Sequence, residues 1–89
     1  MPNFRVLVRG TNFLLKRDGE AKKMGFVSTR YVSAPDVNEA ELTVVDLIHR
    51  DFSDDVLNAR TDPPMLNLEE LEYVEALKPS TGLDFYLEN

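Results

Sequence analysis

The single histidine is the first side chain to test for chemistry, because imidazole exchanges protons near neutral pH. His49 has no cysteine and no second histidine anywhere in the chain with which to share a zinc ion. On the helix that its neighbourhood predicts, it lies off the main apolar stripe and in line with Leu42 and Val45. We expect these three residues at the surface or at an interface, with a pH-sensitive contact or a general base as the alternative for His49.

The carboxylates form two groups. Residues 51–55 hold three aspartates, but Val56 stands where a calcium-binding EF-hand loop needs glycine. Residues 69–72 hold three glutamates, which would act as a glycosidase pair only if they lined a cleft. An 89-residue chain has little material to build such a cleft. The sequence therefore predicts no catalytic, metal-ligating or cofactor-binding residue, and we expect no enzymatic activity and no cofactor.

Motifs for nucleotides and nucleophiles are missing. The four glycines, at positions 10, 19, 25 and 82, are too scattered for a phosphate-binding loop or a serine elbow. Thr29-Arg30-Tyr31 brings a hydroxyl, a guanidinium and a phenol together, yet strand alternation turns Arg30 away from its two neighbours. Arginine and tyrosine are common anchors of protein interfaces. We therefore take Arg30 and Tyr31 as candidate contact residues.

Charge is divided unevenly along the chain. The net charge is −6, from 16 acidic and 10 basic residues. Residues 1–35 hold seven basic and two acidic residues, whereas residues 36–89 hold three basic and fourteen acidic ones. Segregated charge favours recognition of a partner of complementary charge. The leading prediction is a protein that binds another protein through segregated basic and acidic surfaces.

Two alternatives use one half of this charge each. A basic hairpin, made by Lys16, Arg17, Lys22 and Lys23, would contact nucleic acid if nearby aromatic residues stacked on bases. Phe13, Phe26 and Tyr31 are the aromatic candidates. The acidic half would instead bind a basic protein, as an inhibitor or immunity-type protein does.

Residues 3–34 predict a bent β-hairpin. Phe4, Val6 and Val8 alternate with Arg5, Leu7 and Arg9, and a bulge or bend is expected at Gly10. Asp18-Gly19 is typical of a type I′ turn, in which both central residues need positive φ.

Residues 36–51 predict an amphipathic helix. Asp36 is a suitable N-cap, and Glu39 is placed to complete a capping box. The predicted core-facing residues recur at helical spacing: Val37, Ala40, Val44, Leu47 and Ile48.

The second half of the chain is less definite. Residues 53–64 predict a connection, because Pro63-Pro64 bars a helix there. Residues 65–88 predict two strands, with a one-residue slip at Glu69-Glu70, although residues 67–77 also fit a helix that starts at a capping box. A turn is expected at 78–82, before a short closing strand.

Together these elements predict one α+β domain over residues 1–89, in the order ββαββ. About four antiparallel strands would form a small sheet, with the amphipathic helix packed on one face. Little of the chain is left to cover the other face, so we expect a homodimer. The apolar runs are too short for a membrane span or a signal peptide, and the absence of cysteine favours the cytoplasm.

Overall fold

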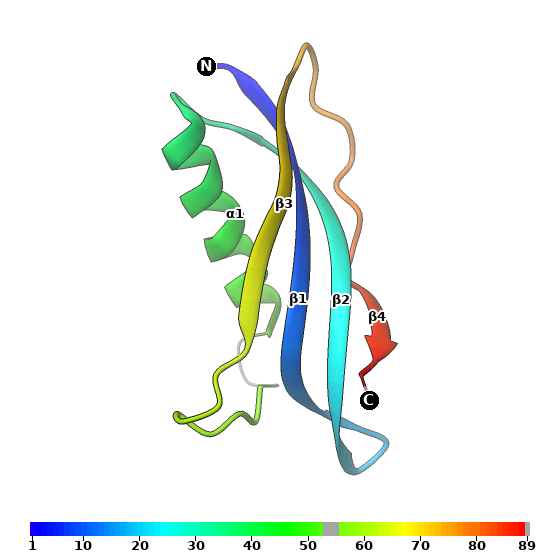
Figure 1. Cartoon of the computed structure of the whole chain (residues 1–89). Coiled ribbons are helices and arrows are strands. Elements are labelled where there is room, and N and C mark those ends of the chain that lie inside the picture. The colour runs from blue at the N-terminus through cyan, green and yellow to red at the C-terminus, as the bar shows by residue number, and fades with distance from the viewer. Residues whose placement is uncertain (53–55, 89) are drawn as a thin grey trace.

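The computed structural model describes residues 1–52 and 56–88. Five elements follow the predicted order (Figure 1): β1 (Asn3–Arg17), β2 (Glu20–Ser33), α1 (Val37–Phe52), β3 (Met65–Val74) and β4 (Asp84–Leu87). The strands form one antiparallel sheet in the order β3-β1-β2-β4, and α1 lies on one of its faces. The predicted α+β fold, with one helix on a four-stranded sheet, is confirmed.

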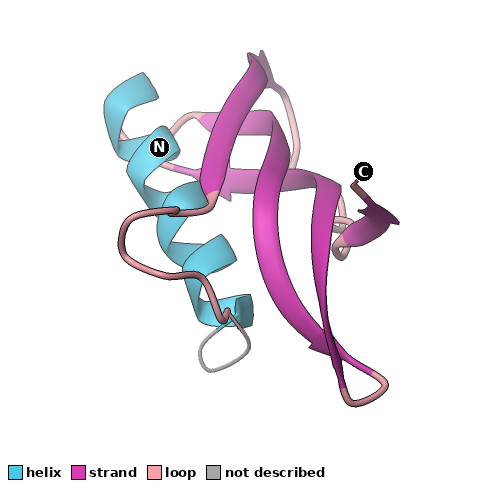
Figure 2. Ribbon diagram, turned by 60° about the horizontal axis from the view of Figure 1, so that its bottom comes forward, coloured by secondary structure: helices cyan, strands magenta, loops and turns pink. Residues whose placement is uncertain are grey.

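The hairpin of β1 and β2 follows the sequence prediction closely. Asp18 and Gly19 have φ angles of 52° and 82°, as a type I′ turn requires. The register shifts between Gly10 and Phe13, where Asn12 also takes a positive φ of 59°. This irregularity is the predicted bulge, and both long strands curve around the helix side of the sheet (Figure 2).

The core lies between α1 and the two central strands. Asp36 caps the helix, because its side-chain oxygen accepts a hydrogen bond of 2.9 Å from the Glu39 amide. At the other end of α1, the Phe52 ring lies 4.9 Å from Phe13 and 5.4 Å from Phe26, measured between centroids. The fully buried apolar residues come from both layers: Phe4, Val6, Val8, Leu15, Phe26, Ala40, Val44 and Ile48.

β3 settles the ambiguity over residues 67–77 in favour of a strand, which ends at Val74. The register between β1 and β3 shifts between Leu7 and Val8, where Leu7 is opposite Glu70 and Val8 is opposite Leu68. The predicted slip at Glu69-Glu70 is therefore a bulge. Helix propensity is a weak preference, and here the hydrogen bonds offered by the free edge of β1 outweigh it.

The segment before β4 differs from the prediction of a turn at 78–82. β3 and β4 lie at opposite edges of the sheet, so residues 75–83 cross the end of the sheet (Figure 1). Ser80 and Thr81 then run along β2, where the Tyr31 amide donates to Ser80 Oγ at 2.9 Å and the Thr81 amide donates to the Thr29 carbonyl at 2.9 Å. A tight turn at 78–82 would have made β4 a neighbour of β3. The outer edge of β2 would then have had no partner strand.

The connection after α1 is confirmed over residues 56–64, where Val56 forms an isolated bridge with Leu15. Residues 53–55, which include the second and third aspartates of the 51–55 cluster, lie outside the described residues. Within the described ranges, no helix is both long enough and apolar enough to cross a bilayer.

Candidate functional site

His49 lies at the rim of a small apolar hollow near the end of α1. The hollow has a volume of about 230 Å³. Its lining combines His49 with five apolar residues: Phe13, Phe52, Val56, Pro64 and Leu66. None of these five carries a group that exchanges protons, so the lining offers the imidazole no acid or base partner. Nor do the described residues hold any group of three metal-ligating side chains close enough to share an ion.

The predicted stripe of Leu42, Val45 and His49 is placed on the outer side of α1. Leu42 is 64% exposed, Val45 is half-buried and His49 is exposed. Because His49 shares its hollow with Leu66 of β3, this side of the helix faces the β3 edge of the sheet. Along its length α1 packs against β2 and β1, and its C-terminal end reaches the beginning of β3 at this hollow.

β3 also carries a row of apolar side chains on the face of the sheet that α1 covers. Leu66, Leu68 and Leu71 are only partly buried against the core, and Tyr73 is 67% exposed although its ring lies 4.7 Å from that of Phe4. We call the combined area the α1/β3 surface. It consists of Leu42, Val45, His49, Leu66, Leu68, Leu71 and Tyr73.

The opposite, open face of the sheet carries charged pairs between β1 and β3. Arg5 donates to Glu72 at 2.6 Å and to Glu70 at 3.0 Å, and these hydrogen bonds raise the pKa of Arg5 above its usual value. Arg9 donates to Glu69 at 3.1 Å and, toward β4, to the Tyr86 hydroxyl at 3.2 Å. The three glutamates thus form an acidic row along β3 that two arginines only partly neutralise.

Arg30 is not available to a partner. Its side chain is on the helix-facing side of β2 and only 10% exposed, with Nε donating to Ser28 Oγ at 2.8 Å and Nη2 to Asp51 at 2.6 Å. The expected contact role is therefore contradicted by burial, since every second β2 residue faces α1. Tyr31, on the open face opposite Arg5, is partly exposed.

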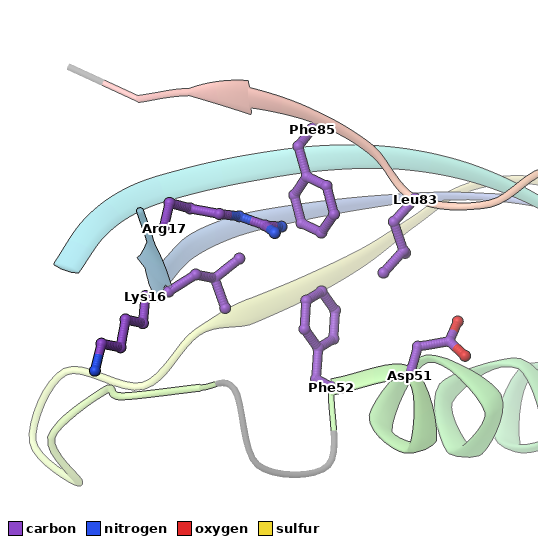
Figure 3. A pocket seen from close by; sticks show the side chains of 7 residues that line it. Lys16, Arg17, Asp51, Phe52, Leu83 and Phe85 are labelled. Carbon is purple, nitrogen blue, oxygen red and sulfur yellow. The ribbon is translucent and has the colours of Figure 1, made fainter. Parts of the chain in front are cut away.

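A second hollow lies beside the Arg30–Asp51 ion pair, between the end of α1 and β4 (Figure 3). Its volume is about 250 Å³, and the Arg17 guanidinium lies over the Phe85 ring, 4.5 Å from the centroid. Asp51 also lines it, but its carboxylate is already bound by Arg30. The remaining lining residues are Leu15, Lys16, Phe52 and Leu83. Two basic residues line the hollow, Lys16 and Arg17, and Arg17 already lies over an aromatic ring. Among the residues that the structure describes, no buried side-chain nitrogen or oxygen lacks a hydrogen-bond partner, so none points to a ligand.

The basic hairpin lacks the aromatic partners that the nucleic-acid alternative requires. Lys16, Arg17 and Lys23 are exposed and Lys22 is half-buried, but Phe13 and Phe26 are 3% and 0% exposed, respectively. Tyr31 lies at the far end of the sheet, where it pairs with Arg5. The expectation that these aromatic residues stack on bases is therefore wrong for the two phenylalanines, because both are needed in the core.

The ion pairs between the arginines of β1 and the glutamates of β3 were not predicted from the sequence. Arg5 and Arg9 alternate on one strand, and Glu70 and Glu72 alternate on another, which is a detectable pattern. What the pattern does not reveal is that β3 lies next to β1 rather than next to β4. The Arg30–Asp51 pair was missed for a similar reason, since its partners are on different elements.

No protein family, no curated protein and no solved structure matches this chain, so the geometry alone carries the functional argument.

Proposed function

We propose that this chain is a small, non-enzymatic binding module that recognises another protein through its α1/β3 surface. The observation that carries this proposal is the position of that surface: exposed and half-exposed apolar residues lie on α1 and on the edge strand β3, and an acidic row lies on the opposite face of β3. Apolar patches with a polar rim are typical of protein-binding sites. The cysteine-free sequence favours the cytoplasm as its place of action.

The acidic row favours a protein partner over nucleic acid. Glu69, Glu70 and Glu72 would repel phosphate groups, and the two phenylalanines that would have stacked on bases, Phe13 and Phe26, are buried in the core. A basic protein surface would be attracted instead, which agrees with the acidic inhibitor type of function.

Self-association is the second candidate. Leu42 is 64% exposed in the middle of the helix, and a two-fold axis through this stripe would bury it against its own copy. A homodimer formed in this way would leave the edge of β3 free for another partner.

Substitution of one exposed leucine tests both candidates. The bait proteins are the wild-type chain, Leu42→Glu, and Leu87→Glu as a matched control, because Leu87 is 66% exposed at the opposite edge of the sheet. We expect a polypeptide captured from a lysate of the source cells by the wild-type and Leu87→Glu baits, and lost with Leu42→Glu. Equal capture by all three baits, or capture of nothing, contradicts the proposal.

Light scattering on the same three proteins measures self-association. A dimer that becomes a monomer only in Leu42→Glu identifies a second copy as the occupant of the helix stripe. An unchanged dimer in that variant moves the interface to the open face of the sheet.

A further inference from the structure

β3 is an edge strand of ten residues, and within the described ranges no strand lies on its outer side (Figure 1). The other edge is much shorter, because β4 has four residues. The free edge of a strand presents N–H and C=O groups that can form hydrogen bonds with a further extended chain. We propose that β3 binds an extended peptide of its partner as a fifth, antiparallel strand, and that this peptide alternates apolar and basic side chains. The inference rests on the proposed function, for which it names the mode of recognition.

The hydrogen bonds of the sheet determine which β3 residues point outward. On the outer side of β2, Thr29 and Tyr31 bond to residues 80 and 81, so the alternate residues of β2 bond to β1. The same alternation, carried across the register of β1, directs the main chains of Glu70 and Glu72 toward β1. The main chains of Leu71 and Tyr73 therefore point to the free edge.

Leu66 and Leu68 continue this free edge on the other side of the bulge. Arg9 is opposite Asn67 and Thr11 is opposite Met65, so Asn67 and Met65 bond inward and the two leucines point outward. The outward groups thus form two short runs, one on each side of Glu69.

The two faces of β3 determine the side chains that the peptide needs. Residues opposite one another in an antiparallel sheet place their side chains on the same face. Peptide residues opposite Leu71 and Tyr73 would lie on the α1 face, next to the apolar side chains of β3 itself. The residues between them would lie on the open face beside Glu70 and Glu72, whose side chains are 59% and 54% exposed. Apolar side chains suit the first environment and basic ones the second.

Charge also excludes a second copy of this chain from the β3 edge. Antiparallel pairing of two β3 strands would place two acidic rows side by side, and like charges on adjacent strands are destabilising. The bulge at Glu69-Glu70 adds a further mismatch to such pairing. The acidic row that opposes self-association at this edge is also the feature that attracts a basic peptide.

The test uses synthetic peptides and the full-length chain. A fluorescein-labelled peptide of eight residues, alternating lysine and valine, is titrated with the chain and followed by fluorescence anisotropy. Two further peptides carry N-methyl groups, one on the valines and one on the lysines. Where the peptide pairs antiparallel with one run, either Leu71 and Tyr73 or Leu66 and Leu68, its valine amides face β3, so valine methylation removes the main-chain hydrogen bonds of that run. We expect binding to weaken about tenfold or more with methylated valines and to stay within about twofold with methylated lysines.

Further controls separate strand addition from plain charge attraction. A peptide with four lysines followed by four valines has the same composition without alternation, and we expect it to bind much more weakly. The peptide in which glutamate replaces lysine should not bind, because it repeats the charge of β3.

The outcomes distinguish this inference from the proposed function. Failure of the unmodified peptide to bind, or equal binding of the two methylated peptides, overturns strand addition. If Leu42→Glu nevertheless loses the captured protein, the α1/β3 surface remains a binding site that uses side chains alone. If capture also fails to depend on Leu42, both proposals are wrong.

Discussion

The two faces of the sheet are built from the same kinds of residue in different surroundings. On the covered face, Gly10 lies opposite Phe26, and Arg30 is bound to Asp51. On the open face, Gly25 lies opposite Tyr86, and Arg5 is bound to two glutamates. Each face thus has one glycine beneath an aromatic ring and an arginine in an ion pair. The difference is the helix, which buries one set and leaves the other in solvent.

The two aromatic rings that cover glycines differ in how tightly their surroundings hold them. Phe26 is fully buried, and its ring is fixed by neighbouring phenylalanines, whereas Tyr86 is 37% exposed and its hydroxyl accepts one hydrogen bond from the exposed Arg9 side chain, which water can replace. A close-packed interior resists any change of volume, while a surface yields to it. The same substitution is therefore expected to have a larger effect on the covered face.

The largest effect is expected for Phe26→Ala. The ring lies 5.2 Å from that of Phe13 and 5.4 Å from that of Phe52, so its removal leaves a cavity at the centre of the core. We expect a loss of about 3–5 kcal/mol in the free energy of unfolding, measured by urea denaturation. Tyr86→Ala is the matched control on the open face, and an equal loss there would contradict the comparison. Phe26→Leu gives a smaller loss and keeps the measurement possible if the alanine variant does not fold.

The second effect is expected for Gly10→Ala. A β-carbon at Gly10 would overlap the Phe26 ring, which cannot move away in the filled core. Overpacking of this kind costs about 1–3 kcal/mol, again measured by urea denaturation. At Gly25 the added carbon would overlap only the Tyr86 ring, which can swing into solvent. We expect Gly25→Ala to be close to neutral, and a larger loss there than at Gly10 would reverse the argument.

The third effect is expected for Arg30→Ala. The substitution removes the hydrogen bond to Ser28 and leaves Asp51 without its cation, although Asp51 is 42% exposed and can be solvated. We expect a loss of about 1–3 kcal/mol in the free energy of unfolding. Asp51→Asn, which keeps an oxygen near the guanidinium, should lose less. Stability unchanged in Arg30→Ala would show that the buried pair contributes nothing.

The smallest effect is expected for Arg5→Ala. Its carboxylate partners are more than half exposed, and water replaces the lost contacts readily. We expect a slight loss of stability that disappears in 1 M salt, where charges are screened within about 3 Å. A loss as large as that of Arg30→Ala would show that the open face is covered in solution. The urea midpoints in low and high salt make this comparison.

The first half of the fold was predictable because its signals are local. The Asp18-Gly19 turn, the alternation of Phe4, Val6 and Val8, and the Asp36 cap each act within a few residues. Residues 67–77 could not be assigned with the same certainty, since their glutamates and leucines favour a helix while the edge of β1 supplies hydrogen bonds to a strand. Only pairing with a distant segment resolves that competition.

The candidate site shows the same division. The exposure of Leu42 and His49 follows from helical spacing and was predicted. The burial of Arg30 was not, because nothing near it in sequence indicates that Asp51 will supply a partner through the end of α1.

By itself, the sequence determined the kinds of element, the covered side of each and the division of charge, because these depend on neighbouring residues and on periodicity. Tertiary structure alone decided that β3 joins β1, that β4 joins β2 and that an acidic row therefore stands beside a free edge. The physical reason is that strand order depends on contacts between residues far apart in the chain, and many such arrangements satisfy the same local preferences until the whole sheet is assembled.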